Sequence, residues 1–515
     1  MSPKPIYLTT PIYYVNDKPH IGHAYTSLAT DVLARWKRLA GHEVFFLTGT
    51  DEHGQKVEKA ARDAGMEPQA FTDQVSQSFR VLAERMNFSN DDFIRTTEPR
   101  HRRACQALWR TLAERGEIYL GHYEGWYAVR DEAFYGPDEL TERDGVKYAP
   151  SGAPVEWVRE PSYFFRLSKW REELLRRYDL PAGHPEAIEI LPESRRNEVR
   201  AFVKAGLQDL SISRTSFTWG VPVPDDPAHV MYVWLDALTN YITAAGYPDE
   251  NAQRWRFWPA DVHFVGKDIV RFHAIYWPAF LMAAGIPPAR RVFAHGWWTI
   301  EGQKMSKSLG NAIDPLALIE EFGLDPLRYF LLREVPFGND GDFARKALIG
   351  RLNGELADGL GNLAQRTLSL IQRNCEGRLP APAEAAAADR AFLATLDALP
   401  GTVGRHLDDQ QFHLALEAVF AAVREANGYI TQQQPWALRR TDPARMAVVL
   451  RHLHTALRIF GTVLSPFMPD TMGRLLDQLG VPGEARQLAD LATPLPEGTA
   501  LPAPTPLFRK IEDAA

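Results

Sequence analysis

Two histidines flank a glycine in the segment His20-Ile21-Gly22-His23, which follows a strand-like stretch and opens a helical one. The first turn of a helix carries unpaired backbone N–H groups and partial positive charge, so it favours an anion such as a phosphate. Histidines three positions apart lie on one side of that turn and can donate hydrogen bonds to one anion, while Gly22 permits close approach to the backbone. An ordinary helix start would also fit this pattern, so the segment alone leaves both interpretations open.

A second phosphate-type motif, KMSKS, spans residues 304–308. Its lysines, Lys304 and Lys307, and the hydroxyl group of Ser306 lie in a turn after a strand-like run, where they can neutralise charge that develops on a leaving pyrophosphate. A solvated basic turn is the alternative for an isolated KMSKS. The early HIGH segment and the late KMSKS segment in one chain argue against coincidence.

The elements around the first motif alternate between strand-like and helix-like segments over residues 5–120. The first helix places Leu28, Val32, Trp36 and Leu39 on one stripe, and the apolar run VFFLT follows it. This order is typical of a doubly wound parallel sheet, a Rossmann-like α/β fold.

The pattern changes to short aromatic strands near Glu117 and returns to alternating strands and helices before the second motif. After about Phe343 the sequence is almost wholly helical, as in a helix bundle. We therefore predict an α/β catalytic domain that is split by a strand-rich insertion and followed by an all-α domain. The predicted ranges are 1–117 for the first half of the catalytic fold, 118–215 for the insertion, 216–342 for the second half, and 343–515 for the helical domain and tail.

The composition excludes several classes of protein. With 515 residues, 45% of them hydrophobic and 24% charged, the chain has the composition of a globular protein, and its net charge of −7 excludes a uniformly basic nucleic-acid coat. Cys105 and Cys375 are far apart and form no Cys-x-x-Cys pair, which fits a reducing cytoplasm. The N-terminal sequence has no signal-peptide pattern, and no apolar run reaches the roughly 20 residues of a membrane span, so we expect a cytoplasmic protein without membrane contact.

HIGH and KMSKS together resemble the motifs of class I aminoacyl-tRNA synthetases. Longer segments narrow the resemblance, nearly end to end, to the methionyl-tRNA synthetase family: TTPIYYVNDKPHIGHAYT, FFLTGTDEHGQKVEKAA, YVWLDALTNY, FVGKDIVRFHAIYWPAFL and AHGWWTIEGQKMSKSLGNAIDP. The resemblance implies that ATP, with Mg²⁺, activates L-methionine as methionyl-adenylate, and that the methionyl group then passes to initiator and elongator methionine tRNA. It implies an ATP site made of His20, Gly22, His23, Lys304, Ser306 and Lys307, with both histidines and both lysines catalytic.

The resemblance also implies a methionine site that is largely aromatic. Its residues are Ile12, Tyr14, Asp51, Trp234, Ala237, Leu238, Tyr241, Ile269, Phe272, His273 and Trp277. A thioether is apolar and polarizable and gains from aromatic contact, and Asp51 supplies a carboxylate for the substrate's ammonium group. Plain core packing is the alternative for these aromatic residues. Asp236 lies in apolar sequence, where an unpaired carboxylate would be costly, so we expect it to have a fixed partner.

The helical third resembles the family's anticodon-binding bundle. Asn362 and Arg366 are four residues apart, on one helix face, and Trp436 follows a Gln-rich break. An amide and a guanidinium can read the edges of an unstacked base, and an indole can stack on it. Between Arg424 and Arg458 there are six arginines and two acidic residues, so this range adds local positive charge that RNA could use. A solvated helix face is the alternative interpretation of these arginines.

The sequence departs from many members of this family in the insertion, which contains no cysteine and so cannot form their zinc-binding knuckles. We therefore expect the zinc-free branch, with no structural metal. The chain ends soon after the bundle, without the appended tRNA-binding domain of some dimeric relatives, and we expect a monomer. The alternatives are a synthetase for another apolar amino acid, a small-molecule adenylyltransferase and an inactive RNA-binding relative. The small insertion disfavours a synthetase for another apolar amino acid, and the helical third disfavours a small-molecule adenylyltransferase. The two intact motifs disfavour an inactive relative.

Overall fold

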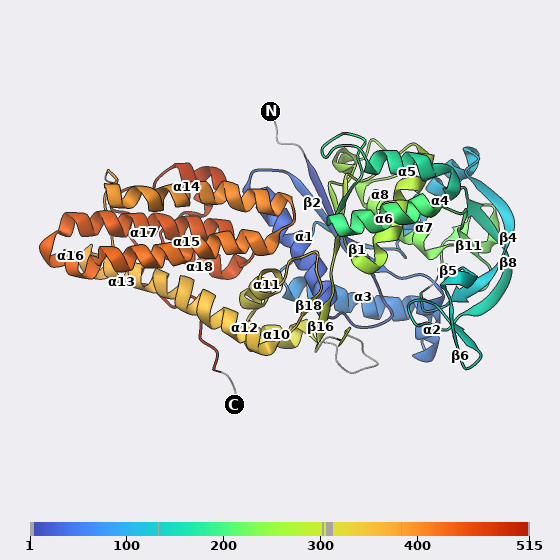
Figure 1. Ribbon diagram of the computed structural model, residues 1–515, viewed down its shortest axis with the longest axis horizontal. Helices are drawn as coiled ribbons and strands as arrows, with labels where there is room; N and C mark the ends of the chain where they lie inside the picture. Colours follow the sequence, from blue (N-terminus) through green and yellow to red (C-terminus); the bar gives the residue numbers. More distant parts are fainter. Residues whose placement is uncertain (1–4, 132, 301–302, 305–312, 383, 513–515) are drawn as a thin grey trace. The chain divides into compact units, whose positions relative to one another are not determined.

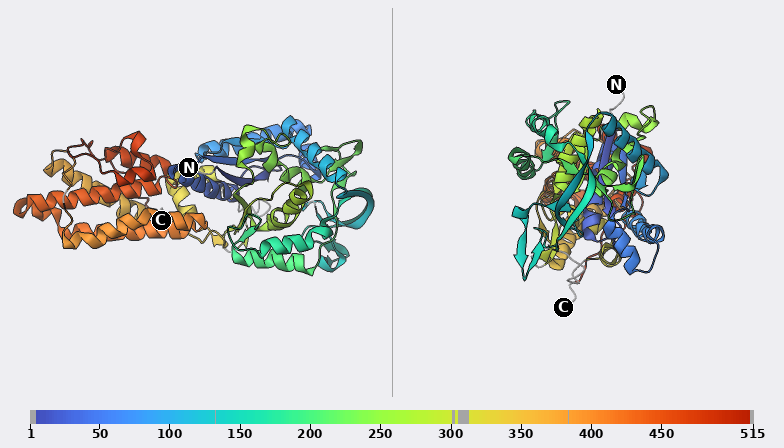
Figure 2. Two further views of the ribbon diagram at one scale, coloured as in Figure 1. Left: turned by 90° about the horizontal axis from the view of Figure 1, so that it is seen from above. Right: turned by 90° about the vertical axis from the view of Figure 1, so that its right-hand side faces the viewer.

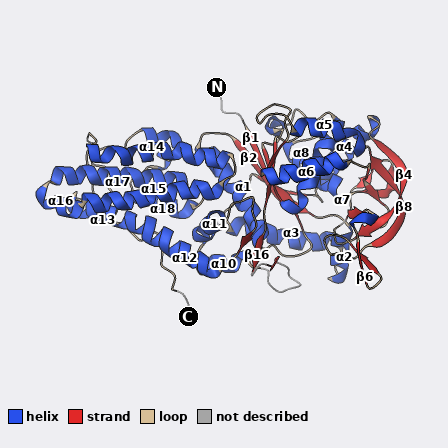
Figure 3. Cartoon of the chain, in the orientation of Figure 1, coloured by secondary structure: helices blue, strands red, loops and turns tan. Residues whose placement is uncertain are grey.

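The computed structural model describes the chain except for residues 1–4, 132, 301–302, 305–312, 383 and 513–515. The chain divides into two compact units. One, which we call the helical unit, consists of His20–Glu43 and the chain from Gly296 onward. The other, the sheet unit, consists of Pro5–Pro19 and Val44–His295. Figure 3 shows that most strands belong to the sheet unit.

A six-stranded parallel sheet lies at the centre of the sheet unit, with the order β3-β2-β1-β14-β15-β9. Its strands are β1 (Ile6–Tyr14), β2 (Val44–Asp51), β3 (Asp92–Arg95), β9 (Glu189–Leu191), β14 (Val262–Gly266) and β15 (Arg291–His295). β2 is buried along its whole length, as expected for a parallel strand covered on both faces. The pairing of β1 with β2 shifts in register between Thr9 and Ile12, around Pro11, which cannot donate a ladder hydrogen bond. The predicted parallel α/β sheet is confirmed.

Helices of the sheet unit precede or follow these strands along the chain (Figure 1). They are α2 (Gln55–Asp63), α3 (Pro68–Arg85), α4 (Pro99–Glu114), α5 (Arg171–Tyr178), α6 (Glu193–Ala205), α7 (Val233–Leu238), α8 (Asn240–Ala245) and α9 (Trp277–Ala284). A π-helical segment, Phe272–Tyr276, leads into α9. Such segments are often found at functional sites.

The predicted insertion contains an antiparallel sheet of order β10-β8-β4-β5 and two smaller sheets nearby in sequence. The strands are β4 (Ile118–Ala128), β5 (Ala133–Tyr135), β6 (Thr141–Arg143), β7 (Val146–Tyr148), β8 (Glu156–Phe165), β10 (Leu210–Ser211), β11 (Ser213–Arg214), β12 (Pro222–Val223) and β13 (Asp226–Met231). The structure differs from the predicted range at two places. β9 falls inside 118–215 yet pairs with β15 of the parallel sheet, and β13 lies beyond residue 215 yet pairs with β11. Part of that range therefore completes the central sheet, and is not strand-rich insertion.

The helical unit contains a three-stranded sheet, β17-β16-β18, and a series of helices. Its elements are α1 (Ile21–Leu39), β16 (Trp298–Ile300), β17 (Gln303–Lys304), α10 (Pro315–Phe322), α11 (Leu324–Arg333), β18 (Gly341–Asp342), α12 (Arg345–Arg351), a π-helical stretch (Leu352–Gly361), α13 (Asn362–Asn374), α14 (Ala387–Asp408), α15 (Phe412–Gln433), α16 (Pro435–Thr441), α17 (Pro443–Leu464) and α18 (Pro469–Gln478). Helices α14, α15 and α17 contact one another and lie side by side in Figures 1 and 2. The predicted helical bundle is confirmed.

Helix α1 belongs to the helical unit, although its sequence position places it in the first half of the predicted catalytic fold. A fully buried ion pair joins Asp31 of α1 to Arg328 of α11 at 2.7 Å. The ring of Tyr25 also packs edge-on against Trp298 and Phe337. These long-range contacts, which no local pattern encodes, decide the unit to which α1 belongs. Among the described residues, no helix is long and apolar enough to cross a membrane.

Candidate active site

The HIGH segment forms the start of α1, with His20 as the residue that caps it. Nδ1 of His20 accepts a hydrogen bond from the N–H of Gly22 at 3.0 Å, and Nδ1 of His23 accepts one from the N–H of His20 at 3.0 Å. A neutral imidazole whose Nδ1 atom accepts must carry its proton on Nε2. Both histidines are therefore Nε2–H donors at a helix N-terminus, an arrangement that suits a phosphate ligand.

Gly22 is required by the packing of this cap. A Cβ atom at that position would lie 2.8 Å from Cε1 of His20, closer than real Cβ contacts allow. A side chain there would displace the His20 ring. The absence of a side chain at Gly22 thus positions the first histidine of the motif.

Of the second motif, the structure describes the backbone of Lys304, which ends β17 and pairs with Thr299 of β16. Ser306 and Lys307 lie outside the described residues. Their assignment to the ATP site, like that of Lys304, stays a prediction.

The methionine-site residues come from four places in the sheet unit: β1, the end of β2, α7 with α8, and the segment 269–277. The rings of Trp234 and Phe272 stack, with centroids 3.8 Å apart and planes inclined by 7°. Ile12, Tyr14, Trp234, Ile269 and Phe272 are partly buried and pack against the core cluster that contains Leu238, Tyr241 and Trp277. The sheet unit thus brings together residues that are more than 200 positions apart in sequence.

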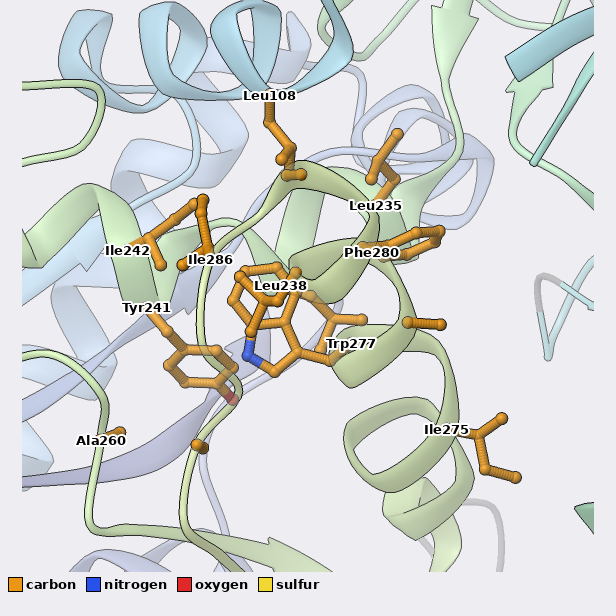
Figure 4. Packing of buried hydrophobic residues seen from close by; sticks show 14 of the residues in the cluster. Leu108, Leu235, Leu238, Tyr241, Ile242, Ala260, Ile275, Trp277, Phe280 and Ile286 are labelled. Atoms are coloured by element: carbon orange, nitrogen blue, oxygen red, sulfur yellow. The ribbon is translucent and has the colours of Figure 1, made fainter. Parts of the chain in front are cut away.

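The predicted methionine-site residues differ in how far they are buried. Trp277, shown with Leu238 and Tyr241 in Figure 4, has no exposed surface and is packed as a core residue. Ala237 is also buried, in α7. Trp234 and Phe272, in contrast, keep some exposed surface and can contact a ligand without rearrangement of the core.

His273 and Tyr241 form a buried hydrogen-bonded pair within this set. Nδ1 of His273 lies 3.0 Å from the carbonyl oxygen of Ile269, and Nε2 lies 2.7 Å from the Tyr241 hydroxyl group. The carbonyl can only accept, so Nδ1 carries the proton, and the neutral ring accepts at Nε2 from the tyrosine. Burial lowers the pKa of His273 from 6.5 to about 4, which keeps the ring neutral at physiological pH.

The neutral state of His273 predicts a pH-dependent stability. Because the folded-state pKa is depressed, the unfolded chain takes up this proton first, so the contribution is complete above about pH 6.5 and is lost as pH falls toward 4. The loss should amount to about 3 kcal/mol of unfolding free energy. Chemical denaturation at several pH values should show a slope that is smaller for His273→Gln, by about 1.4 kcal/mol per pH unit between these limits. Equal slopes for both proteins would contradict a buried neutral His273.

Asp51 ends β2 and is paired in register with Tyr14, the last residue of β1. Its residue surface is only 3% exposed, and its charge acts on Tyr241. The carboxylate and the aromatic residues therefore lie in the same region of the sheet unit. Carboxyl ends of parallel strands are the usual place for ligands in such folds.

The expectation that Asp236 has a fixed partner is confirmed, and it has two. Its carboxylate oxygens lie 2.7 Å from Nδ1 of His53 and 2.7 Å from Nε2 of His101. Burial by itself would raise the pKa of the Asp236 carboxyl group, but the two imidazoles reverse this effect and hold the pKa below its ordinary value. Sequence reasoning missed His101, which lies in α4 and gives no local signal of its role.

The proposed anticodon residues gather on the helical unit. Asn362 begins α13 and is exposed, and the guanidinium of Arg366, one turn later, lies 5.4 Å from the centroid of the Trp436 ring. Trp436, in α16, is 43% exposed. A tryptophan in the bundle core would be covered, so core packing does not account for this residue.

The excess of arginines between Arg424 and Arg458 does not form one RNA-facing surface. Arg451 and Arg458 are buried and donate to backbone carbonyl groups of residues 380, 485, 490, 493 and 495. Arg445 pairs with Asp389. These three arginines hold the bundle and the C-terminal segment together, so half of the six arginines in this range are used internally.

The fold and the HIGH segment together define a class I tRNA synthetase: the family model described as "tRNA synthetases class I (M)" matches residues 6–368. A second model, the anticodon binding domain of methionyl tRNA ligase, matches residues 379–515. The chain belongs to the methionyl-tRNA synthetase family.

Similar proteins cover the chain from end to end. The methionine–tRNA ligase of Brucella suis is 56% identical over 516 residues, covering 100% of this chain and 99% of the relative. That of Rickettsia bellii is 56% identical and covers 94% of each chain. The solved structure of Mycobacterium tuberculosis methionyl-tRNA synthetase in complex with methionyl-adenylate has a TM-score of 0.95 and 51% identity, covering 98% of this chain and 99% of that one. The apo form of the same synthetase has a TM-score of 0.89, with 48% identity and 99% coverage of both chains.

Proposed function

We infer that this chain ligates L-methionine to methionine tRNA in two steps, with release of pyrophosphate and then AMP. The observation that carries this inference is the full-length match to methionine–tRNA ligases. Amino-acid-dependent exchange of pyrophosphate into ATP, measured across the twenty amino acids, tests it. Exchange with leucine, isoleucine or valine in place of methionine would contradict it.

We propose that adenylate formation is promoted by positioning and charge stabilisation, and that it needs no general base because the methionine carboxylate is already ionised at neutral pH. A methionine carboxylate oxygen bonds to the α-phosphorus of Mg²⁺-bound ATP, and the bond to pyrophosphate breaks. His20 and His23 donate from Nε2 to phosphate oxygens, and Lys304, Ser306 and Lys307 bind the leaving pyrophosphate. A ribose hydroxyl group at the 3′ end of the tRNA then attacks the methionyl carbonyl carbon, its proton passes to a phosphate oxygen of the departing AMP, and the bond between the carbonyl carbon and AMP breaks.

We propose that Asp51 binds the ammonium group of methionine and that Trp234 and Phe272 contact the thioether. The stacked pair is supported by its geometry and by its partial exposure. Tyr241 and His273 form the polar base of the pocket through their hydrogen bond. Ile12, Tyr14, Ala237, Leu238, Ile269 and Trp277 complete the apolar wall or its support.

We propose that the chain works as a cytoplasmic monomer that needs no structural zinc and charges initiator and elongator tRNA alike. The zinc-free proposal is supported by the insertion, where Ala128, Ala149, Ala153 and Val155 form a small apolar core. Nearby, Asp131 accepts hydrogen bonds from Tyr135 and from Ser151. Side-chain packing and these hydrogen bonds hold this region without cysteine ligands.

Homocysteine should be activated by this chain, because it differs from methionine by one methyl group. The loss of one carbon from an apolar pocket is worth about 1 to 3 kcal/mol, which is a discrimination of only 10 to 200-fold. We expect the homocysteine thiol to attack the carbonyl carbon of its own adenylate and to release AMP and a thiolactone. ATP consumption and thiolactone formation at high homocysteine concentration measure this reaction, and the absence of both would contradict the prediction.

A further inference from the structure

The carboxylate of Asp236 connects three separate elements of the sheet unit. Asp236 lies in α7, His101 in α4, and His53 just beyond the end of β2. All three side chains are buried, Asp236 and His101 completely so. Within the described chain, the only basic groups that the structure pairs with this carboxylate are the two imidazoles, each at 2.7 Å.

The carboxylate determines the hydrogen-bond directions in this cluster. A carboxylate can only accept, so Nδ1 of His53 and Nε2 of His101 both carry protons. The other ring nitrogen of His101 lies 3.2 Å from the Thr243 hydroxyl oxygen, and that hydroxyl donates its hydrogen to the carbonyl of Thr239 at 2.9 Å. Both imidazoles therefore donate to the carboxylate, and these two hydrogen bonds offset the cost of burying it.

The distances from the Asp236 carboxylate to the two imidazoles are those of hydrogen bonds. Cys105 lies beside His101, with its sulfur 3.2 Å from Nε2, so His101, Cys105 and Asp236 offer metal-ligand atoms close together. Two ligands of one tetrahedral zinc ion, each at about 2.0 to 2.1 Å from it, are separated by roughly 3.3 Å. The 2.7 Å separation of the His101 nitrogen and the Asp236 oxygen instead places a shared proton between them.

The cluster lies next in sequence to both halves of the proposed methionine site. His53 follows Asp51 by two positions, and Asp236 follows Trp234 by two positions. The segment at His53 is further held by Trp219, whose indole N–H donates to the carbonyl of Glu52 and whose ring packs edge-on against His53. The distance between the end of β2 and α7 is thus set by hydrogen bonds to one buried carboxylate.

We propose that Asp236 is a positioning residue for methionine binding: through His53 and His101 it fixes the ammonium-binding Asp51 relative to the thioether-binding Trp234. This rests on the proposed assignment of Asp51 and Trp234. Asp236 touches no substrate in this role. It acts by holding two substrate contacts at the separation that the amino acid requires.

The test is Asp236→Asn in pyrophosphate exchange, with the full chain. An asparagine keeps the shape of the side chain, but it removes the charge and turns an amide N–H toward one histidine donor. We expect the KM for methionine to rise about tenfold, with the KM for ATP changed less than twofold. The matched control is Asp389→Asn, a second buried carboxylate that pairs with Arg445 in the bundle of the helical unit. The control should lower the melting temperature without changing the KM for methionine.

A double-mutant cycle separates positioning from general stability. If Asp236 acts through Asp51, then Asp51→Asn and Asp236→Asn should raise the KM for methionine less together than the product of their separate effects. An Asp236→Asn protein that is folded and has an unchanged KM for methionine would overturn the proposal, as would equal changes for methionine and ATP. An Asp51→Asn protein with unchanged KM would instead show that the methionine site itself is wrongly assigned.

Discussion

Replacing His20 with asparagine should slow adenylate formation by about 10² to 10³-fold, the usual effect of removing one preorganised donor to a transition state. The asparagine side-chain oxygen can take the place of Nδ1 and accept from the N–H of Gly22, a bond that is 3.0 Å long in the structure. Asparagine is also a favourable residue at a helix N-cap. The substitution removes the Nε2–H donor, so the rate should fall in kcat. Pre-steady-state formation of methionyl-adenylate measures this fall. The melting temperature should change little, because the helix cap is kept.

Glutamine at the same position is the matched control. Its amide nitrogen reaches the place of Nε2, whereas its oxygen does not reproduce the cap acceptor. We therefore expect His20→Gln to retain more activity and to lose more stability than His20→Asn. His23→Asn should behave like His20→Asn, because Nδ1 of His23 has the same accepting role toward the N–H of His20. The same small loss of activity in all three variants would show that HIGH serves only as a helix cap.

Replacing Trp436 with alanine should reduce the charging of methionine tRNA by about 10 to 100-fold. Removal of a stacking surface costs about 1 to 3 kcal/mol per base, and this ring is 43% exposed beside the guanidinium of Arg366. Pyrophosphate exchange without tRNA should remain normal, since the proposed contacts with ATP and methionine all lie before residue 310. Both reactions and the melting temperature are to be measured on one preparation.

Trp436→Phe is the control for this prediction, because phenylalanine keeps a ring that can stack on a base. It should restore most of the charging that alanine loses. Loss of both reactions together with a lower melting temperature would assign Trp436 to the bundle core. A stable alanine variant with normal charging would refute the anticodon assignment.

Local patterns in the sequence were enough to predict the main elements. The apolar stripe of the first helix is confirmed by Leu28, Val32 and Trp36, all of which are buried in α1. The strand-like runs at the start of the chain form the parallel strands β1 and β2. The HIGH segment caps the helix, as its position between a strand and a helix predicts. These properties depend on neighbours within about one turn of helix or one strand, so the sequence alone determines them.

Tertiary structure alone decided the contacts between distant segments. The pairing of β9 with β15, the buried bond between Asp31 and Arg328, and the internal use of Arg451 and Arg458 follow no local pattern. The hydrogen bonds of Asp236 with His53 and His101 also follow no local pattern. The sequence predicts that a buried carboxylate has a hydrogen-bonding partner, because burial without one is costly. The identity of that partner depends on which side chains the completed fold brings within hydrogen-bond distance.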